Sequence, residues 1–199
     1  MNEFFLFQKF HNTGCILEFF KRKKTSKNQD LIRTIYGTLT IVWELLESQG
    51  NSNTAERQAL IQQVLQIIPK ENIECIVADR EFIGEEWFKY LDETQGLNFA
   101  IRVKKSEQIP HPNGGKVKLS HVFKDINETD IMTHKTKIYK TPIQITALGL
   151  PQEELLIVAS NYVMGQEALT IYKKRWSIER TFKSLKTSGF NIEDTHITD

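Results

Sequence analysis

The stretch of sequence that most constrains the fold covers residues 171–190, which have the clearest helical period in the chain. Residues at steps of three and four share one stripe of a helix, and this stripe carries Tyr172, Arg175, Glu179, Phe182 and Lys186. Apolar side chains flank it on both sides, so the stripe faces the body of the protein or a cleft in it. A glutamate in such a place is costly to bury unless it is paired or holds a metal ion.

Two interpretations of this glutamate are open. Arg175 lies one turn before Glu179, and ion pairs at that spacing are common on ordinary helices. Alternatively, the stripe supplies a carboxylate and several cations to a functional site. The spacing of all four polar residues favours the second interpretation, because two, three and six residues separate Tyr172, Arg175, Glu179 and Lys186.

This spacing resembles the Tyr-Arg-Glu-Lys signature of the DDE transposases of the insertion-sequence-four type. Two further stretches are similar to the same family: WELLESQGNSNTAER, which ends at Arg57, and SGFNIEDTHITD after the signature. The resemblance covers residues from about 30 to 199. It implies an α/β protein with a ribonuclease-H-like mixed sheet, flanking helices and a β-rich insertion. The implied activity is DNA transposition by metal-dependent cleavage and transfer of DNA strands.

Length and composition allow one main domain. The 199 residues are 40% hydrophobic and 26% charged, which is enough for one sizeable core. The net charge of +1 argues against a globally basic nucleic-acid binder but leaves room for a local basic groove. Cys15 and Cys75 show no pairing pattern, and the apolar run near the N-terminus is too short to span a membrane. We therefore expect a cytoplasmic protein, associated with the nucleoid through DNA and not with a membrane.

The chain predicts alternating strands and helices. Strands are expected where β-branched and apolar residues cluster, at residues 14–20, 34–43, 73–78, 98–103 and 155–160. Further β-like pieces occupy residues 116–123, 136–139 and 143–148. Asn53 followed by Glu56 predicts a helix start, and its apolar face continues to Pro69. A second helix is expected at residues 85–91.

Asp79 directly follows the apolar strand at residues 73–78. Functional groups collect at the carboxyl ends of strands in sheets flanked by helices, but an aspartate here is equally suited to capping the next helix. The resemblance favours the functional interpretation, because DREF at residues 79–82 looks like the second catalytic aspartate of the family. Asp79 and Glu179 would then be two of the three catalytic acids.

The resemblance also implies roles for the other site residues. Asp79 and Glu179 would hold Mg²⁺ or Mn²⁺, since such ions take oxygen ligands and activate the oxygen that attacks a phosphodiester. Tyr172, Arg175 and Lys186 would grip phosphates beside the scissile bond in the ends of a transposon. The expected partners are DNA and either a second copy of the chain or a full-length relative.

The first acid of the family has no clear counterpart. It belongs on the opening strand of the sheet, yet the acids before Glu44 are Glu3, Glu18 and Asp30, and none has the family's neighbours. The resemblance therefore implies a truncated and catalytically impaired transposase, because a lost ligand weakens ion binding and misplaces the attacking oxygen. Two alternatives remain. The chain could be a catalytically silent DNA-binding or interaction module, or the product of a decayed reading frame that does not fold stably.

These expectations divide the chain into two parts. Residues 1–30 form a non-matching, loosely attached segment, because they lack the alternating pattern of a strand. Residues 31–199 form a partial catalytic domain with a β-rich insertion at about 98–153. The opening strands of the sheet are then missing or replaced.

Overall fold

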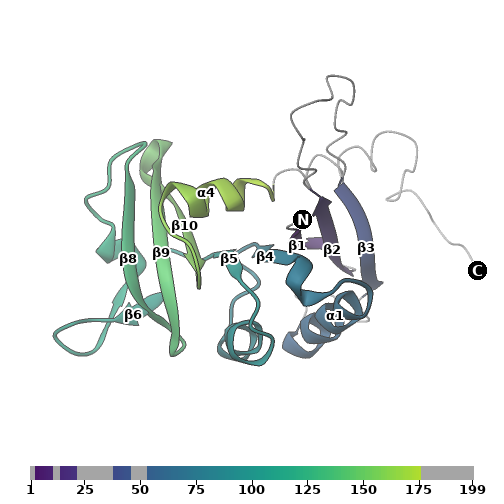
Figure 1. Cartoon of the computed structure of the whole chain (residues 1–199). Coiled ribbons are helices and arrows are strands. Elements are labelled where there is room, and N and C mark those ends of the chain that lie inside the picture. The colour runs from purple at the N-terminus through teal and green to yellow at the C-terminus, as the bar shows by residue number, and fades with distance from the viewer. Residues whose placement is uncertain (1–2, 11–13, 22–37, 46–52, 176–199) are drawn as a thin grey trace, which may run out of the picture.

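One mixed sheet runs through the computed structural model, which describes residues 3–10, 14–21, 38–45 and 53–175. Within these residues the sheet has eight strands in the order β3-β2-β1-β4-β5-β10-β9-β8 (Figure 1). Their bounds are β1 Glu3–Phe10, β2 Gly14–Lys21, β3 Thr38–Leu45, β4 Ile73–Ala78, β5 Phe99–Arg102, β8 Ile131–Ile138, β9 Thr141–Leu150 and β10 Glu154–Ser160. A separate hairpin pairs β6 (Gln108–Pro110) with β7 (Lys116–Lys118).

The sheet has a parallel centre and antiparallel wings. β1, β4 and β5 run parallel, so their carboxyl ends meet at one edge. β2 and β3 continue the sheet antiparallel on one side of β1. On the other side, β10, β9 and β8 extend it antiparallel beyond β5. The β-rich part of the chain that precedes α4 thus prolongs the central sheet.

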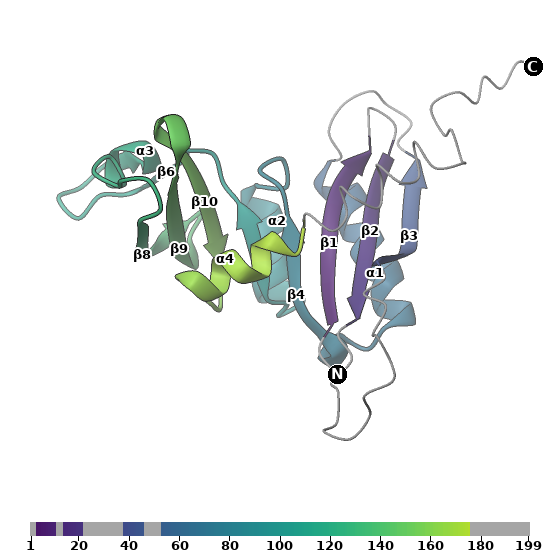
Figure 2. The ribbon, with the colours of Figure 1, turned by 90° about the horizontal axis from the view of Figure 1, so that it is seen from above.

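Helices cover both faces of the sheet (Figures 1 and 2). The helices α1 (Thr54–Ile67) and α2 (Glu85–Lys89) lie on one face, and α4 (Gln166–Lys173) crosses the other. Shorter helical pieces are η1 Lys70–Asn72, η2 Tyr90–Thr94, α3 Leu119–Val122 and η3 Pro151–Glu153. This arrangement confirms the mixed α/β, ribonuclease-H-like fold predicted from the sequence.

The start of α1 follows from its first residues. The Oδ1 atom of Asn53 accepts a hydrogen bond from the Glu56 N–H at 2.9 Å, and Glu56 Oε2 accepts one from the Asn53 N–H at 2.8 Å. This capping box satisfies two of the N–H groups that a helix leaves unpaired at its start. After this start, α1 buries Leu60, Ile61 and Val64 against the sheet. The helix start at Asn53 and the apolar face were therefore both predicted correctly from the sequence.

The alternation of β4 divides the core in two. Ile76 and Ala78 belong to the cluster shared with α1 and α2, whereas Cys75 and Val77 belong to the cluster shared with α4. Successive side chains of a strand point to opposite faces of the sheet. Asp79, the next residue after β4, therefore continues the side of Cys75 and Val77 and faces α4.

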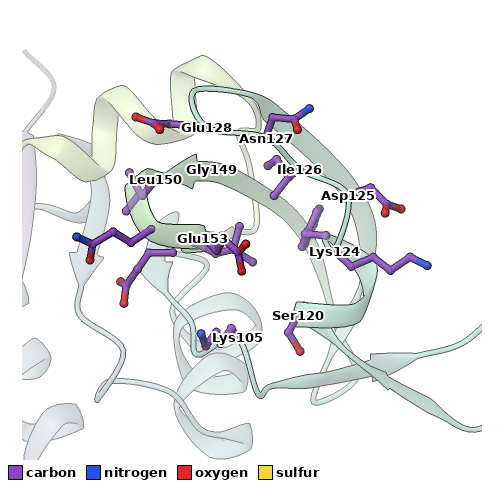
Figure 3. A pocket seen from close by; sticks show the side chains of 14 residues that line it. Lys105, Ser120, Lys124, Asp125, Ile126, Asn127, Glu128, Gly149, Leu150 and Glu153 are labelled. Carbon is purple, nitrogen blue, oxygen red and sulfur yellow. The ribbon is translucent and has the colours of Figure 1, made fainter.

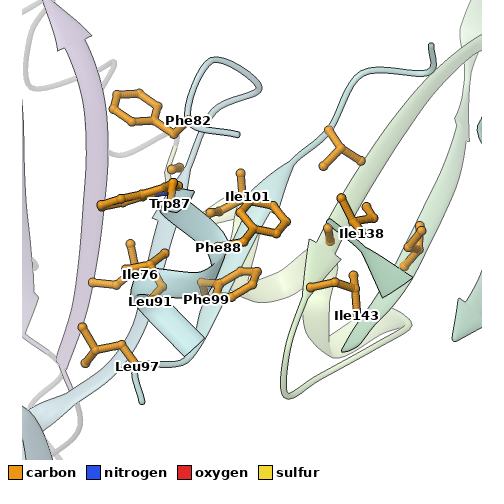
Figure 4. Close-up of a cluster of buried hydrophobic side chains, with 14 of the residues drawn as sticks. Ile76, Phe82, Trp87, Phe88, Leu91, Leu97, Phe99, Ile101, Ile138 and Ile143 are labelled. Carbon is orange, nitrogen blue, oxygen red and sulfur yellow. The ribbon is translucent and has the colours of Figure 1, made fainter. Parts of the chain in front are cut away.

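The larger cluster packs aromatic rings from α2 against the sheet (Figure 4). Trp87 and Phe88 are fully buried, and the rings of Phe88 and Phe99 lie 4.9 Å apart between centroids. Burial of an aromatic side chain of this size stabilises a fold by about 1.5–3 kcal/mol relative to leaving it exposed. The packing holds α2, and with it the turn that follows β4, firmly on the sheet.

Two segments differ from the expectation. The expectation of a loose N-terminal segment is wrong for residues 3–10 and 14–21, because β1 pairs with both β2 and β4. The strand pairing overrides the missing alternation, because β1 is held by backbone hydrogen bonds to a neighbour on each side. Residues 116–123 are β only as far as Lys118; Leu119–Val122 turn into α3, which buries Leu119.

Candidate active site

Asp79 leaves the carboxyl end of β4 at the start of a turn. Its Oδ1 accepts a hydrogen bond from the backbone N–H of Arg80 at 2.7 Å, and its carbonyl oxygen accepts one from the N–H of Phe82 at 2.9 Å. The turn leads to α2, whose N-cap is Gly84 without a side-chain capping bond. The alternative interpretation of Asp79 as the cap of this helix is therefore wrong.

The guanidinium of Arg175, just past the end of α4, reaches Asp79. Arg175 Nη1 lies 3.9 Å from Asp79 Oδ2, and the two side chains keep 7% and 32% of their surface exposed. Because the pair is partly removed from water, salt screens it less than an ordinary surface ion pair. The structure thus brings together two of the predicted site residues from segments that are far apart in the sequence.

Tyr172 contacts Arg175 through both its hydroxyl group and its ring. The Nε–H of Arg175 donates a hydrogen bond to Tyr172 Oη at 3.1 Å, and the guanidinium carbon lies 5.7 Å from the ring centroid. Tyr172 is 1% exposed. Burial raises the pKa of its hydroxyl, and the charge of Arg175 opposes that rise. Neither side chain is presented at the surface, so their predicted grip on phosphates stays a prediction.

A second arginine, Arg57 on α1, holds the turn that follows Asp79. Its Nη2 donates a hydrogen bond to the carbonyl oxygen of Glu81 at 3.1 Å, and its guanidinium lies 4.9 Å from the centroid of the Phe82 ring. Arg57 is 6% exposed. Sequence reasoning missed this role, although a signal was present: Arg57 lies at helical steps from the buried residues Leu60 and Val64, as Glu179 does in its own stripe.

Arg102 is another residue that sequence reasoning missed. Ala78 pairs with Ile101 in the parallel register of β4 and β5, so Arg102 and Asp79 are the next residues of the two strands. Arg102 is partly exposed. Its charge also acts on Tyr172, where it favours the ionised hydroxyl and lowers its pKa against the effect of burial.

Other predicted residues are described in part or not at all. Glu179, Lys186 and Asp30 lie outside the described residues, so their roles stay predictions. Glu18 is placed by its backbone: it pairs with Leu6 of β1, which puts it one strand further from β4 than β1 itself.

The described residues alone do not fit a magnesium ion. Both carboxylate oxygens of Asp79 already have a neighbour, the N–H of Arg80 at Oδ1 and the guanidinium of Arg175 at Oδ2. Among the residues that the structure describes, no three His, Cys, Asp or Glu side chains form a group that could hold a metal ion. Mg²⁺ needs near-octahedral oxygen coordination, and a single carboxylate paired with a cation does not supply it.

A hollow of about 840 Å³ lies by the corner between β9 and β10 (Figure 3). None of the predicted site residues lines it. Its charged lining residues are mainly acidic: Lys105, Lys124, Asp125, Glu128, Glu153 and Glu154. Such a lining repels phosphate groups, so this hollow is separate from the site at Asp79 in both place and chemistry.

Comparison with known proteins assigns the chain to a family. The family model of the Transposase DDE domain matches residues 21–199. The matched part contains β3, the turn after β4 and α4, and it begins at the last residue of β2. No curated protein matches the chain significantly. In the described ranges, no helix has the length and apolar character needed to cross a membrane.

Proposed function

Since the chain belongs to the transposase DDE domain family, we propose that it is a DNA-binding transposase domain of the insertion-sequence-four type with an impaired strand-cleaving centre. The contact between Arg175 and Asp79 carries this proposal. It joins the Tyr-Arg-Glu-Lys signature to the aspartate at the end of β4, which is where an active site of this family would need both.

Glu179 completes the proposed centre together with Asp79. In the sequence, Glu179 follows Arg175 by four residues, which is the helical step that the signature predicts. Domains of this family generally use divalent metal ions, and we assign Mg²⁺ or Mn²⁺ to Asp79 and Glu179 together. The ion, when bound, would supply the positive charge that activates the attacking oxygen. Lys186 would add a cation for the phosphates of the transposon end.

The register of β1 supports the proposal that strand cleavage is impaired. Phe7 pairs with Ala78, so the residue of β1 at the level of Asp79 is Gln8, whereas Glu3 pairs with Ile73 at the far end of the strand. No residue of β1 therefore offers a carboxylate beside Asp79. A misplacement of about 1 Å costs on the order of a hundredfold in rate, and a lost ligand costs at least as much.

A second candidate function is a catalytically silent DNA-binding or interaction module that acts with a second copy or a full-length relative. The pairing of Asp79 with Arg175 favours it, because a guanidinium already neutralises the carboxylate that would hold an ion. The two functions differ in one measurable property. The impaired transposase retains slow, metal-dependent cleavage, and the silent module has none.

A cleavage assay tests both candidates. We expect the purified chain to bind duplex DNA in a salt-dependent way and to nick it, with Mg²⁺ or Mn²⁺, at a rate close to background. Asp79→Asn and Glu179→Gln are the matched controls, because each removes a charge and keeps the size of the side chain. Rapid metal-dependent nicking that both substitutions abolish would show that Glu18, Asp30 or a second chain supplies a third carboxylate. The impairment would then be disproved, and a chain that binds no DNA would disprove both functions.

A further inference from the structure

The start of α4, the helix that leads to Arg175, is held by a side chain of a distant strand. Gly165 is the N-cap of α4, has no side-chain capping bond and lies at φ 66°, in the left-handed region that favours glycine. Its N–H donates a hydrogen bond of 2.7 Å to Oγ1 of Thr146 on β9. Thr146 is fully buried. The backbone at the start of α4 is therefore tied to a strand that precedes it by 19 residues.

Two more side chains hold the turn between β10 and α4. Ser160 Oγ accepts hydrogen bonds from the N–H groups of Tyr162 and Val163, both at 3.2 Å. Asn161 Oδ1 accepts one from the N–H of Phe99 on β5 at 2.8 Å. The chain therefore leaves β10 along a path that hydrogen bonds fix at several points before α4 begins.

α4 carries this fixed start to the candidate active site. From the β10 side it crosses β5 and β4 (Figure 2), and it buries Leu169, Ile171 and Tyr172 on the way. Arg175 follows Gly165 by ten residues, which corresponds to about 15 Å at 1.5 Å per residue. A tilt of about 4° at one end of a rod of this length moves the other end by about 1 Å. Displacements of about 1 Å matter to catalytic geometry.

We propose that Thr146 is a positioning residue for the candidate active site. Its hydroxyl fixes the start of α4 and so sets the place from which Arg175 Nη1 reaches Asp79 Oδ2. A valine of the same shape would fill this buried position without the cost of burying a hydroxyl, so the threonine contributes the bond to Gly165. The β-rich part of the chain thereby acts on the site through β9. The proposal rests on the proposed function only in taking Asp79 as catalytic.

A double-mutant cycle in the full chain, measured by urea denaturation, tests this role. Thr146→Val keeps the shape of the side chain and loses the hydroxyl, and Arg175→Gln removes the guanidinium that reaches Asp79. Distant sites that act independently have additive effects on stability. If Thr146 places Arg175, the shift of the urea midpoint caused by Thr146→Val should be about half as large in the Arg175→Gln background as in the parent. Thr146→Ser keeps the hydroxyl and should restore most of the midpoint lost in Thr146→Val.

Thr141→Val is the matched control, because Thr141 lies on the same strand, is 2% exposed and undergoes the same chemical change. Its midpoint shift should be the same with and without Arg175→Gln. Equal shifts for Thr146→Val in both backgrounds, or a Thr146→Ser variant as unstable as Thr146→Val, would overturn the proposal and leave the proposed function in place. A parent that binds no DNA would remove the proposed function, while the coupling of Thr146 to Arg175 would still be measurable. Should Thr146→Val not fold, Thr146→Cys, whose thiol is a weaker acceptor, takes its place in the cycle and is judged by the same criterion.

Discussion

At the scale of residues, Asp79, Arg175 and Tyr172 form a short chain of contacts. Arg175 Nη1 lies 3.9 Å from Asp79 Oδ2, while its Nε–H donates to Tyr172 Oη at 3.1 Å. One guanidinium thus orients the candidate catalytic carboxylate and gives a buried hydroxyl its donor. A buried polar group without a partner costs more than the bond it loses, so this chain couples the stability of the fold to the geometry of the site.

Replacing Arg175 by alanine should therefore destabilise the protein. Loss of the bond to Tyr172 and of the contact with Asp79 should lower the free energy of unfolding by about 1–3 kcal/mol, measured by urea denaturation. Arg175→Lys keeps the charge but not the rigid fork and should recover only part of that loss. Lys173→Ala on the exposed side of α4 is the control. Equal stability of the Arg175→Ala and Lys173→Ala variants would contradict the described contacts.

A second prediction at this scale concerns Cys75. Burial raises the pKa of its thiol from the ordinary 9.0 to about 12. The folded state therefore keeps a proton that the unfolded state releases, so the related stability is complete below pH 9 and is lost as the pH rises toward 12. In a Cys15→Ser variant, Cys75 should react with a thiol reagent at neutral pH only as fast as the protein unfolds. Labelling of the native protein at the rate of a free thiol would show that Cys75 is accessible.

At the scale of elements, α1 and the turn after β4 act as one unit. Arg57 crosses from the first turn of α1 to the carbonyl oxygen of Glu81 and the ring of Phe82. Phe82 in turn donates its N–H to the carbonyl oxygen of Asp79. The helix that starts at the capping box of Asn53 therefore positions the candidate catalytic aspartate, although it contributes no atom to the site itself.

Removing the arginine of α1 should loosen this unit. Arg57→Met keeps the apolar stem and loses the hydrogen bond to Glu81, which should cost about 1–2 kcal/mol of unfolding free energy. Because the turn carries Asp79, amide hydrogen exchange in residues 79–83 should speed up more than exchange in β10. Gln63→Met on the exposed side of α1 is the matched control. An exchange pattern unchanged from the parent would show that Arg57 does not hold the turn.

At the scale of the whole molecule, the N-terminal strands are part of the main sheet. β1 lies between β2 and β4, so its backbone is paired on both sides. β1 and most of β2 lie outside the part that the family model matches. The opening positions of the sheet are therefore occupied by residues that do not match the family, and these residues bring no acid to the level of Asp79.

A proline in β1 tests whether this strand belongs to the sheet. Leu6 pairs with Glu18 on one side and with Val77 on the other. Leu6→Pro removes a backbone donor from a strand that is paired on both sides, where proline is not tolerated, and should cost about 3 kcal/mol or more. Leu6→Val keeps the donor and is the control. If both variants melt at the same temperature, residues 3–10 are not part of the cooperative fold.

The sequence by itself determined the local elements and the chemistry of single residues. The capping box at Asn53 and the apolar strand before Asp79 depend on neighbours a few residues away, so the sequence alone predicts them. Only the tertiary structure decided that Arg175 meets Asp79, that Arg57 supports the turn, that Arg102 stands beside Asp79 and that β1 enters the sheet. Each of these depends on strand order and register, which join residues distant in the sequence. The physical reason is that alternation tells on which face a side chain lies but not which strand lies next to it.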